Sequence, residues 1–272
     1  MSFINLYDSH THSDNSPDGR ESVTYMCERG VATGLRGIAF TDHCEVDNYE
    51  GGRYHISIRQ SNFECLKAKS VFRGSLIVSS GIELGQPLTN PNIADRLLSD
   101  YDFDFVLASV HNASSGADYY YIDYSEFGDA DVRLLLQGYF EDVLAVARWN
   151  RFDSLAHLTY PLRYLHANGI SVDLTEYSDI IDEILKTLAH NAKALEINTS
   201  GFRQGLGTTL PPQFCVKRFR ELGGEYITIG SDGHRSDDVG MNIQDGMQLA
   251  LDAGFNQFAL YLSRTPMLID LK

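Results

Sequence analysis

The 272-residue sequence predicts an α/β fold in which parallel strands form a closed or nearly closed barrel surrounded by helices. Short apolar segments alternate with segments of helical spacing, which predicts a parallel sheet with right-handed crossovers. Seven of the apolar segments end in side chains that bind metal ions: 7–12, 38–43, 78–83, 107–111, 154–157, 195–198 and 227–234. Because β/α barrels build active sites at the carboxyl ends of their strands, the sequence indicates an enzyme.

The individual elements follow one another at the spacing of strand–helix units. After the first strand, Asp18-Gly19 and Ser22 predict a turn and a helix start, and Gly34 ends that helix. Further helices are expected at residues 58–72, 92–99, 129–149, 176–191, 213–222 and 243–253. Residues 258–262 form either an eighth strand or a plug of the barrel. No repeat or linker divides the sequence, so we expect one domain over residues 1–272.

The composition argues against two classes of partner. A net charge of −15 with no run of Lys or Arg disfavours nucleic acid. The four cysteines have no CxxC spacing, the first residues do not resemble a secretion signal, and no apolar segment approaches the ~18 residues that span a bilayer. We therefore expect a cytoplasmic protein with no membrane partner, and the choice between monomer and homo-oligomer stays open.

The predicted strand ends supply a large set of metal ligands. His10 and His12 lie two residues apart on a strand, so their side chains share one face and can bind one ion. Five further ligands end other strands: Glu83, His111, His157, Asp232 and His234. Imidazole and carboxylate ligands without thiolate suit zinc, iron or manganese. With His43 and a carboxylate from Asp14 or Asp18, the set suffices for two or three divalent ions.

Six motifs in this order resemble those of the polymerase-and-histidinol-phosphatase (PHP) superfamily, and they cover almost the whole chain. They are His10-Thr11-His12, Thr41-Asp42-His43, Gly81-Ile82-Glu83, Ser109-Val110-His111, His157 and Ser231-Asp232-Gly233-His234. Residues 156–161 and 195–203 further resemble the histidinol-phosphate phosphatase family within that superfamily. The resemblance implies a distorted (β/α)7, TIM-like barrel whose active site lies at the carboxyl ends of the strands.

The resemblance also implies how the ligands divide among three ions. The first ion takes four residues: His10, His12, Glu83 and Asp232. Glu83 bridges to the second ion, which is also bound by His111 and His157, and the third ion takes His43 and His234. Some relatives add another histidine to the third ion, at a position that is Asp18 here. Asp18 is therefore the expected third ligand, and Asp14 is the alternative if the loop runs differently.

The expected chemistry is hydrolysis of a phosphomonoester, with direct attack by a metal-bridging hydroxide and no phosphoenzyme. No Ser or Cys lies in a nucleophile-elbow or P-loop context that would compete with this route. Arg163 and Arg203 match the family's phosphate-binding arginines, and a guanidinium can bind phosphate with two hydrogen bonds. Asp42 and His234 are the candidate catalytic residues; Asp42 either delivers a proton to the leaving group or orients a metal-bound histidine.

A long tyrosine-rich stretch, residues 112–128, follows His111. Loops of this length in compact domains are usually functional, so the stretch is predicted to be a lid that contacts substrate, with a solvated loop as the alternative. Histidinol phosphate carries an ammonium and an imidazole, for which Glu45, Asp123 and Tyr119 to Tyr121 are expected to supply an acidic contact and an aromatic wall. Glu196 is expected inside the barrel, and Asn198 either contacts substrate or bonds backbone groups.

The sequence therefore predicts a phosphatase that converts L-histidinol phosphate to L-histidinol and inorganic phosphate in histidine biosynthesis. One alternative is a PHP phosphoesterase acting on nucleotides or oligonucleotide ends, which the acidic charge disfavours. The other is a PHP domain that binds metal without catalysis, which the complete ligand set disfavours.

Overall fold

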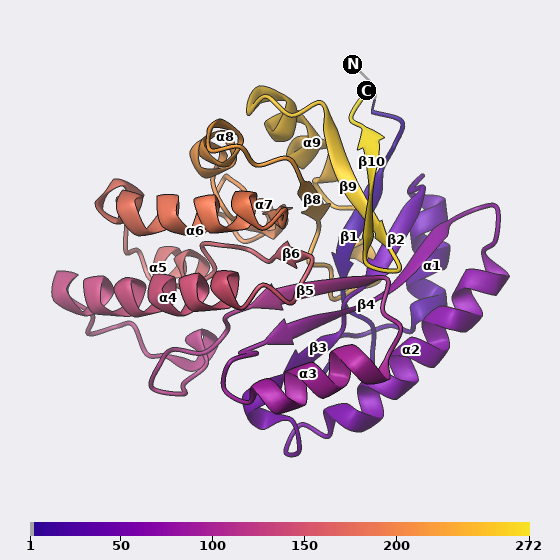
Figure 1. Cartoon of the computed structure of the whole chain (residues 1–272), viewed down its shortest axis with the longest axis horizontal. Coiled ribbons are helices and arrows are strands. Elements are labelled where there is room, and N and C mark those ends of the chain that lie inside the picture. Colours follow the sequence, from indigo (N-terminus) through magenta and orange to yellow (C-terminus); the bar gives the residue numbers. More distant parts are fainter. Residues whose placement is uncertain (1–2) are drawn as a thin grey trace.

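A computed structural model describes residues 3–272 and shows a barrel of parallel strands with helices around it (Figure 1). The strands are β1 (Tyr7–Thr11), β2 (Gly37–Phe40), β3 (His43–Glu45), β4 (Ile77–Gly85), β5 (Phe105–Ser109), β6 (Ser154–Leu155), β7 (Ala194–Asn198) and β8 (Ile227–Gly230). They pair in the order β1-β2-β4-β5-β6-β7-β8, and β3 continues the position of β2 beside β4. In the described residues the barrel thus has seven positions, which confirms the predicted (β/α)7 arrangement.

The ends of β1 and β8 close the barrel. Thr11 pairs with Gly233 in a parallel bridge, and the His12 amide donates a hydrogen bond to the Gly233 carbonyl at 2.9 Å. Below this bridge the buried Asp8 carboxylate accepts hydrogen bonds from the amide (2.8 Å) and hydroxyl (2.5 Å) of Ser231. The first and last barrel strands therefore present their metal-binding motifs side by side.

Helices cover the outside of the barrel. They are α1 (Val23–Ala32), α2 (Tyr54–Val71), α3 (Pro91–Asp100), α4 (Asp129–Trp149), α5 (Leu162–Ala167), α6 (Ser178–His190), α7 (Ser200–Arg203), α8 (Gln213–Glu221) and α9 (Ile243–Asp252). In Figure 1, α4 and α6 lie together on one side of the barrel, and α1 and α2 lie together on the other. Ser22 caps α1 by accepting a hydrogen bond from the Tyr25 amide, as the sequence predicts. None of the helices within residues 3–272 is long and apolar enough to cross a membrane.

Alternate residues of each strand point into the barrel. On β5 the inward positions include Phe105 and Leu107, and His111 follows on the same face. On β2 the inward Ala39 packs in the same buried cluster, and His43 follows at the same period of two. The side-chain period therefore places an apolar floor at the amino-terminal end of the barrel and a polar site at the other end.

The apolar C-terminal segment forms a plug rather than an eighth barrel strand. β9 (Gln257–Leu262) pairs antiparallel with β10 (Thr265–Asp270) in a separate two-stranded sheet. Ala259 and Tyr261 of β9 pack into the apolar floor, and the Tyr261 hydroxyl donates to the Asp153 carbonyl at 3.4 Å. The hairpin thus closes the barrel at the amino-terminal ends of the strands, close to the first described residues (Figure 1).

Candidate metal and phosphate site

The structure brings all nine residues predicted as metal ligands into one cluster at the carboxyl ends of the strands. The nine are His10, His12, Asp18, His43, Glu83, His111, His157, Asp232 and His234. Three overlapping groups within this cluster have ligand atoms within 4.8 Å of one another: His12, His43 and His234; His10, His12 and Glu83; and His43, Glu83 and His111. The convergence follows from the barrel, because the nine residues lie on or follow strands at six of its seven positions.

Glu83 lies at the centre of the cluster, with its side chain completely buried. Its Oε2 faces three imidazoles: His10 Nε2 at 3.4 Å, His12 Nε2 at 3.5 Å and His43 Nδ1 at 3.0 Å. Its Oε1 faces two others: His111 Nε2 at 3.1 Å and His157 Nε2 at 2.9 Å. One carboxylate therefore separates two sets of histidines, which is the arrangement expected of a bridging ligand.

A third set lies at the more exposed edge of the cluster. His43 Nε2 and His234 Nε2 are 3.4 Å apart, and the carboxylate of Asp18 lies 3.7 Å from the first and 3.2 Å from the second. Asp14 is exposed, and its charged neighbours are the carboxylates of Glu64 and Asp42 rather than these histidines. The loop geometry therefore places Asp18, not Asp14, beside the third set.

The contacts between the imidazoles fit bound cations. Three pairs of Nε2 atoms lie close together: His10 and His12 at 3.0 Å, His111 and His157 at 3.4 Å, and His43 and His234 at 3.4 Å. Two neutral nitrogen lone pairs at such distances repel each other unless a proton or a metal ion lies between them. Glu83 Oε2 is buried and accepts no hydrogen bond, so it also lacks a partner that a cation supplies. Imidazole and carboxylate donors of this kind suit zinc, iron or manganese.

The charged groups of the cluster shift one another's pKa values in both directions. Burial lowers the pKa of His10, His43 and His111, but the neighbouring carboxylates raise it, to about 9 for His43 and well above the usual range for the other two. Burial raises the pKa of Glu83 and of Asp232, but the neighbouring histidines hold both pKa values well below their usual range. Burial lowers the pKa of His12 and of His157. At neutral pH the two carboxylates are therefore ionised and these two imidazoles are neutral, as metal binding requires.

Arg163 borders the cluster and has free hydrogen-bonding capacity. Its Nη2 lies 3.3 Å from Asp232 Oδ2 and 3.4 Å from the Ser200 hydroxyl, and its guanidinium lies 4.4 Å from the ring centre of Tyr160. The side chain is only 11% exposed, and its buried Nε has no acceptor. A buried guanidinium with an unsatisfied N–H beside a metal-type cluster is suited to binding an anion.

Arg203, the second arginine predicted to bind phosphate, contacts the backbone next to the cluster. Its Nη1 and Nη2 donate to the carbonyls of Ser231 (3.2 Å) and Asp232 (3.0 Å), and its Nε lies 3.5 Å from Asp238 Oδ1. Asp232 has a φ of +53°, a conformation that non-glycine residues rarely adopt. Arg203 therefore holds the strained turn that aims Asp232 into the cluster.

Asp42, a candidate catalytic residue, lies behind the metal-type cluster among serine side chains. Its buried carboxylate accepts four hydrogen bonds, from the Ser13 amide (2.6 Å) and from the hydroxyls of Ser13 (2.8 Å), Ser16 (2.8 Å) and Ser61 (2.5 Å). The Ser16 hydroxyl in turn lies 3.2 Å from His12 Nδ1. Asp42 is thus surrounded by serines and orients a histidine through one of them, which agrees with the alternative role in the sequence analysis.

Tyr119 is the residue of the 112–128 loop that was predicted to bind substrate. Its side chain is buried in the main apolar core, where its ring packs edge-on against Tyr139 and Tyr160. Tyr160 instead faces the site, with its ring centre 4.9 Å from that of His111 and 4.8 Å from that of His157. The sequence signal for Tyr160 was its position just beyond the strand that ends at His157, the same signal that identified Arg163.

Two further carboxylates contact the outer nitrogens of ligand histidines. Glu45 Oε1 lies 2.8 Å from His111 Nδ1, and Glu196 Oε1 lies 2.6 Å from His10 Nδ1. Glu45 was expected to contact the substrate. In the structure its Oε1 contacts the His111 ring instead. Glu196 lies inside the barrel, as expected.

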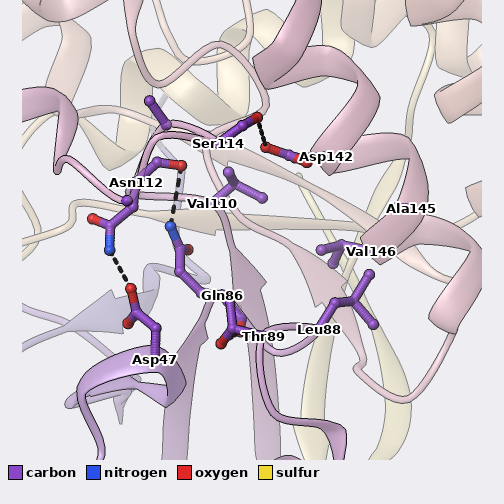
Figure 2. Close-up of a pocket in the computed structure, with 12 residues that line it drawn as sticks. Asp47, Gln86, Leu88, Thr89, Val110, Asn112, Ser114, Asp142, Ala145 and Val146 are labelled. Carbon is purple, nitrogen blue, oxygen red and sulfur yellow. Dashed lines mark hydrogen bonds between the residues drawn. The ribbon is translucent and has the colours of Figure 1, made fainter.

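A cavity of about 340 Å³ lies behind this site rather than in it (Figure 2). Val110 and Asn112, which flank His111 in the sequence, line the cavity together with Asp47 and Gln86. Gln86 accepts a hydrogen bond from the His111 amide (2.9 Å) and donates one to the Asn112 carbonyl (3.3 Å). None of the nine clustered residues lines this cavity, so the chemistry belongs to the cluster at the barrel mouth.

The chain resembles known proteins over nearly its full length. The PHP domain family model matches residues 8–200. A probable histidinol-phosphatase of Clostridium acetobutylicum is 30% identical over 249 residues, 90% of this chain and 92% of that protein. The histidinol-phosphatase of Lactococcus lactis is 28% identical over 259 residues, 93% of each chain. A crystal structure of histidinol phosphate phosphatase from Lactococcus lactis, complexed with zinc, L-histidinol and phosphate, superposes with a TM-score of 0.77 at 26% identity, covering 97% of this chain and 99% of that one.

Proposed function

The chain belongs to the PHP domain family, and we propose that it is a metal-dependent phosphatase that hydrolyses L-histidinol phosphate to L-histidinol and inorganic phosphate. The observation that carries the proposal is that Glu83 faces two sets of histidines while the buried Arg163 borders the same cluster. Such a site suits a phosphomonoester, whose phosphoryl oxygens need positive charge on several sides. The relative crystallised with zinc, L-histidinol and phosphate supports this particular substrate.

The cluster is proposed to bind two or three divalent ions, with zinc supported by that relative and iron and manganese compatible with the same ligand types. His10, His12, Glu83 and Asp232 are the proposed ligands of the first ion. Glu83, His111 and His157 are those of the second, and Asp18, His43 and His234 those of the third. When bound, paired ions activate a water molecule and neutralise phosphoryl oxygens.

The arginines have different parts in this proposal. Arg163 binds the phosphoryl group, because its guanidinium is buried at the cluster and its Nε is unpaired. Arg203 fixes the turn at Asp232 through two carbonyls, and the second N–H of each of its terminal nitrogens is left to bind the same phosphoryl group. His234 remains the candidate catalytic histidine, since its side chain is a quarter exposed and it lies at the open edge of the cluster.

Aromatic residues are proposed to receive the organic end of the substrate. Tyr160 and Tyr164 are joined by a 2.7 Å hydrogen bond between their hydroxyls, and Tyr160 lies against the rings of two ligand histidines. The exposed Tyr120 ring lies 6.0 Å from that of Tyr164. Tyr120, rather than the buried Tyr119, is therefore the proposed contribution of the 112–128 loop to a substrate lid.

The experiment that tests the function compares three substrates on metal-loaded protein: L-histidinol phosphate, a nucleoside 3′,5′-bisphosphate and a short 5′-phosphorylated oligonucleotide. The proposal predicts that kcat/KM for L-histidinol phosphate exceeds the other two values by at least about 100-fold. Faster turnover of either nucleotide would support the alternative phosphoesterase. If no phosphomonoester is hydrolysed while chelation lowers the melting temperature, the domain binds metal without catalysis.

A further inference from the structure

We propose that Glu45 and Glu196 are positioning residues that hold the rings of His111 and His10, and that Gly85 and Gly230 are glycines because each makes room for one of these pairs. The inference rests on the proposed metal site, but not on the identity of the substrate. It assigns to Glu45 and Glu196 a role on the protein side of the histidines, away from the reacting atoms. It also explains two glycines that no turn requires.

The Glu196–His10 pair is buried on all sides. Glu196 Oε1 lies 2.6 Å from His10 Nδ1, and the two side chains are 1% and 0% exposed. The other oxygen, Oε2, accepts hydrogen bonds from the His157 amide (2.8 Å) and from the Asn198 side chain (3.1 Å). The carboxylate is thus fixed at three points, and it fixes the His10 ring in turn.

The Glu45–His111 pair repeats this arrangement on the other side of the site. Glu45 Oε1 lies 2.8 Å from His111 Nδ1, and the His111 amide is held separately by the side chain of Gln86 at 2.9 Å. Both the backbone and the ring of His111 are therefore anchored. The ring has one remaining nitrogen, Nε2, which points to Glu83.

The two pairs set the same tautomer. A ring whose Nδ1–H donates to a carboxylate carries its lone pair on Nε2, and the carboxylate makes that lone pair a better metal ligand. His10 Nε2 faces Oε2 of Glu83 at 3.4 Å, and His111 Nε2 faces Oε1 at 3.1 Å. Each histidine set flanking Glu83 therefore contains one ring that is held by a carboxylate.

Among the other ligand rings, His43 directs its Nδ1 to Glu83 Oε2 at 3.0 Å, and the other three have weaker partners or none at Nδ1. His12 Nδ1 lies 3.2 Å from the Ser16 hydroxyl, and His234 Nδ1 lies 3.0 Å from the Asp232 carbonyl. Within the described residues, His157 Nδ1 is buried and has no hydrogen-bond partner. A short contact between Nδ1 and a carboxylate outside the nine predicted ligands is thus a feature of His10 and His111, since the corresponding contact between His43 Nδ1 and Glu45 Oε1 is 3.6 Å long.

The glycines show that space is reserved for both pairs. A Cβ atom at Gly85 would lie 1.9 Å from Glu45 Oε2. A Cβ atom at Gly230 would lie 2.4 Å from the His10 Cβ and 2.8 Å from Glu196 Oε1. Neither glycine has a positive φ, so backbone conformation does not require glycine at either position. The lack of a side chain lets each carboxylate–histidine pair lie directly against a neighbouring strand.

The test measures zinc affinity by chelator competition and the tautomers of the histidine rings by long-range ¹H–¹⁵N NMR. Glu45→Leu removes the acceptor, and we expect it to lower the affinity for at least one zinc ion by about 10- to 100-fold and to redistribute the His111 tautomers. Glu45→Gln keeps an acceptor oxygen of the same shape and is expected to recover most of the affinity. Glu50→Gln, at an exposed position nearby, is the matched control and leaves both readouts unchanged.

A second variant keeps the inference testable if Glu45→Leu does not fold. Gly85→Ala displaces the Glu45 carboxylate without altering any polar group, so it is expected to reproduce the loss of zinc affinity. Gly138→Ala is its control, because a Cβ there meets only ordinary contacts, the nearest at 3.5 Å from the Ser114 hydroxyl. Wild-type zinc affinity and unchanged His111 tautomers in both Glu45→Leu and Gly85→Ala would overturn the inference. Since neither readout uses a substrate, failure of the proposed phosphatase activity would be seen separately.

Discussion

Glu83 connects the two sets of histidines through the two oxygens of a single carboxylate. Its position on β4 directs it inward because Ser79, Gly81 and Glu83 share one face of the strand. Gly81 has no Cβ, and one built there would lie 2.8 Å from the Phe105 carbonyl, so β4 approaches its neighbour closely just before Glu83. The central ligand therefore depends on strand packing as well as on its own chemistry.

Replacing Glu83 tests its proposed bridging role directly. Glu83→Ala is expected to lose metal and activity together, with kcat/KM falling by more than about 100-fold. Mutating a residue that only supports a metal ligand typically costs about 10- to 100-fold in affinity or activity, and Glu83 is proposed to bind two ions itself. Elemental analysis of the purified variant and phosphate-release kinetics measure the two losses. The exposed Glu50→Ala is the control. Full metal content and full activity in Glu83→Ala would remove the bridge from the account.

Arg163 is expected to act on the substrate and not on the metals. Arg163→Ala should lower kcat/KM by about 10² to 10³-fold while metal content stays at the wild-type level, because it removes charged donors to the phosphoryl group. Arg163→Lys should recover only part of this loss, since an ammonium lacks the planar fork. Arg148→Ala removes an exposed arginine that pairs with Glu183 and serves as the control. Loss of metal in Arg163→Ala would instead assign it to the support of Asp232.

For individual residues, the sequence predicted which side chains converge better than it predicted the contacts that support them. His111 and Asp232 were identifiable because each ends a strand, and strand ends of a barrel converge. The burial of Tyr119 was not identifiable, because it depends on how the 112–128 loop folds over the core. The carbonyl contacts of Arg203 depend on the positive φ of Asp232, which sequence periodicity does not report.

Among the elements, the β9–β10 hairpin is attached to the barrel by an ion pair between the half-buried Arg264 and the buried Asp153. The Arg264 guanidinium contacts both carboxylate oxygens of Asp153 at 2.8 to 3.0 Å. Asp153 Oδ2 also accepts a hydrogen bond from the Val106 amide at the start of β5 (2.9 Å). The pair thus connects the plug to the amino-terminal ends of the barrel strands, far from the metal cluster.

Removing Arg264 is expected to affect stability and not catalysis. Arg264→Ala should lower the free energy of unfolding by about 2 kcal/mol at pH 7, because it removes the guanidinium that is bonded to the buried Asp153 carboxylate and leaves only the more distant charge of Lys193. Burial raises the pKa of Asp153 although Arg264 lowers it, so the pKa rises further in the variant. A protonated carboxyl group needs no cation. The loss of stability in Arg264→Ala is therefore present at a pH above the pKa of Asp153 in the variant, and it becomes smaller as the pH falls below that pKa.

Denaturant unfolding at pH 7 and at about pH 4 measures this effect. Arg151→Ala, which breaks an exposed pair with Asp95, is the control and should cost no more than about 1 kcal/mol. An equal loss of stability at both pH values would contradict the linkage to Asp153. A large fall in kcat/KM at full metal content would contradict the purely structural role of the hairpin.

The helices and strands also show which elements the hydrophobic periodicity of the sequence predicts and which it does not. The predicted helix over 129–149 matches α4 at both ends, because Gly128 and Asp131 mark its start and an apolar stripe continues to Trp149. The short apolar segment 258–262 is compatible with both a barrel strand and a plug, so its pattern predicts neither over the other. The structure shows a plug because this segment pairs with the antiparallel strand β10. The residues of β10 are mostly exposed and do not alternate regularly, so the sequence gives little indication of a strand there.

For the whole molecule, the metal cluster accounts for part of the acidic composition. The net charge of −15 counts every carboxylate as free and every histidine as neutral, yet Glu83, Asp232 and Asp18 all face the histidine cluster. Divalent ions at this site would reduce the negative charge at the barrel mouth, where a phosphate must enter. The fold therefore concentrates cation-type ligands and Arg163 in one place, which is how an acidic protein would bind the proposed anionic substrate.

The measurement that tests the central claim most directly is phosphate release from L-histidinol phosphate by protein whose metal content is known from elemental analysis. p-Nitrophenyl phosphate serves as the comparison substrate. The account predicts two or three bound metal ions and a kcat/KM for L-histidinol phosphate of at least about 10⁴ M⁻¹s⁻¹, far above the comparison value. Slow turnover of both compounds by fully metal-loaded protein would contradict the proposed substrate while leaving the metal site in place.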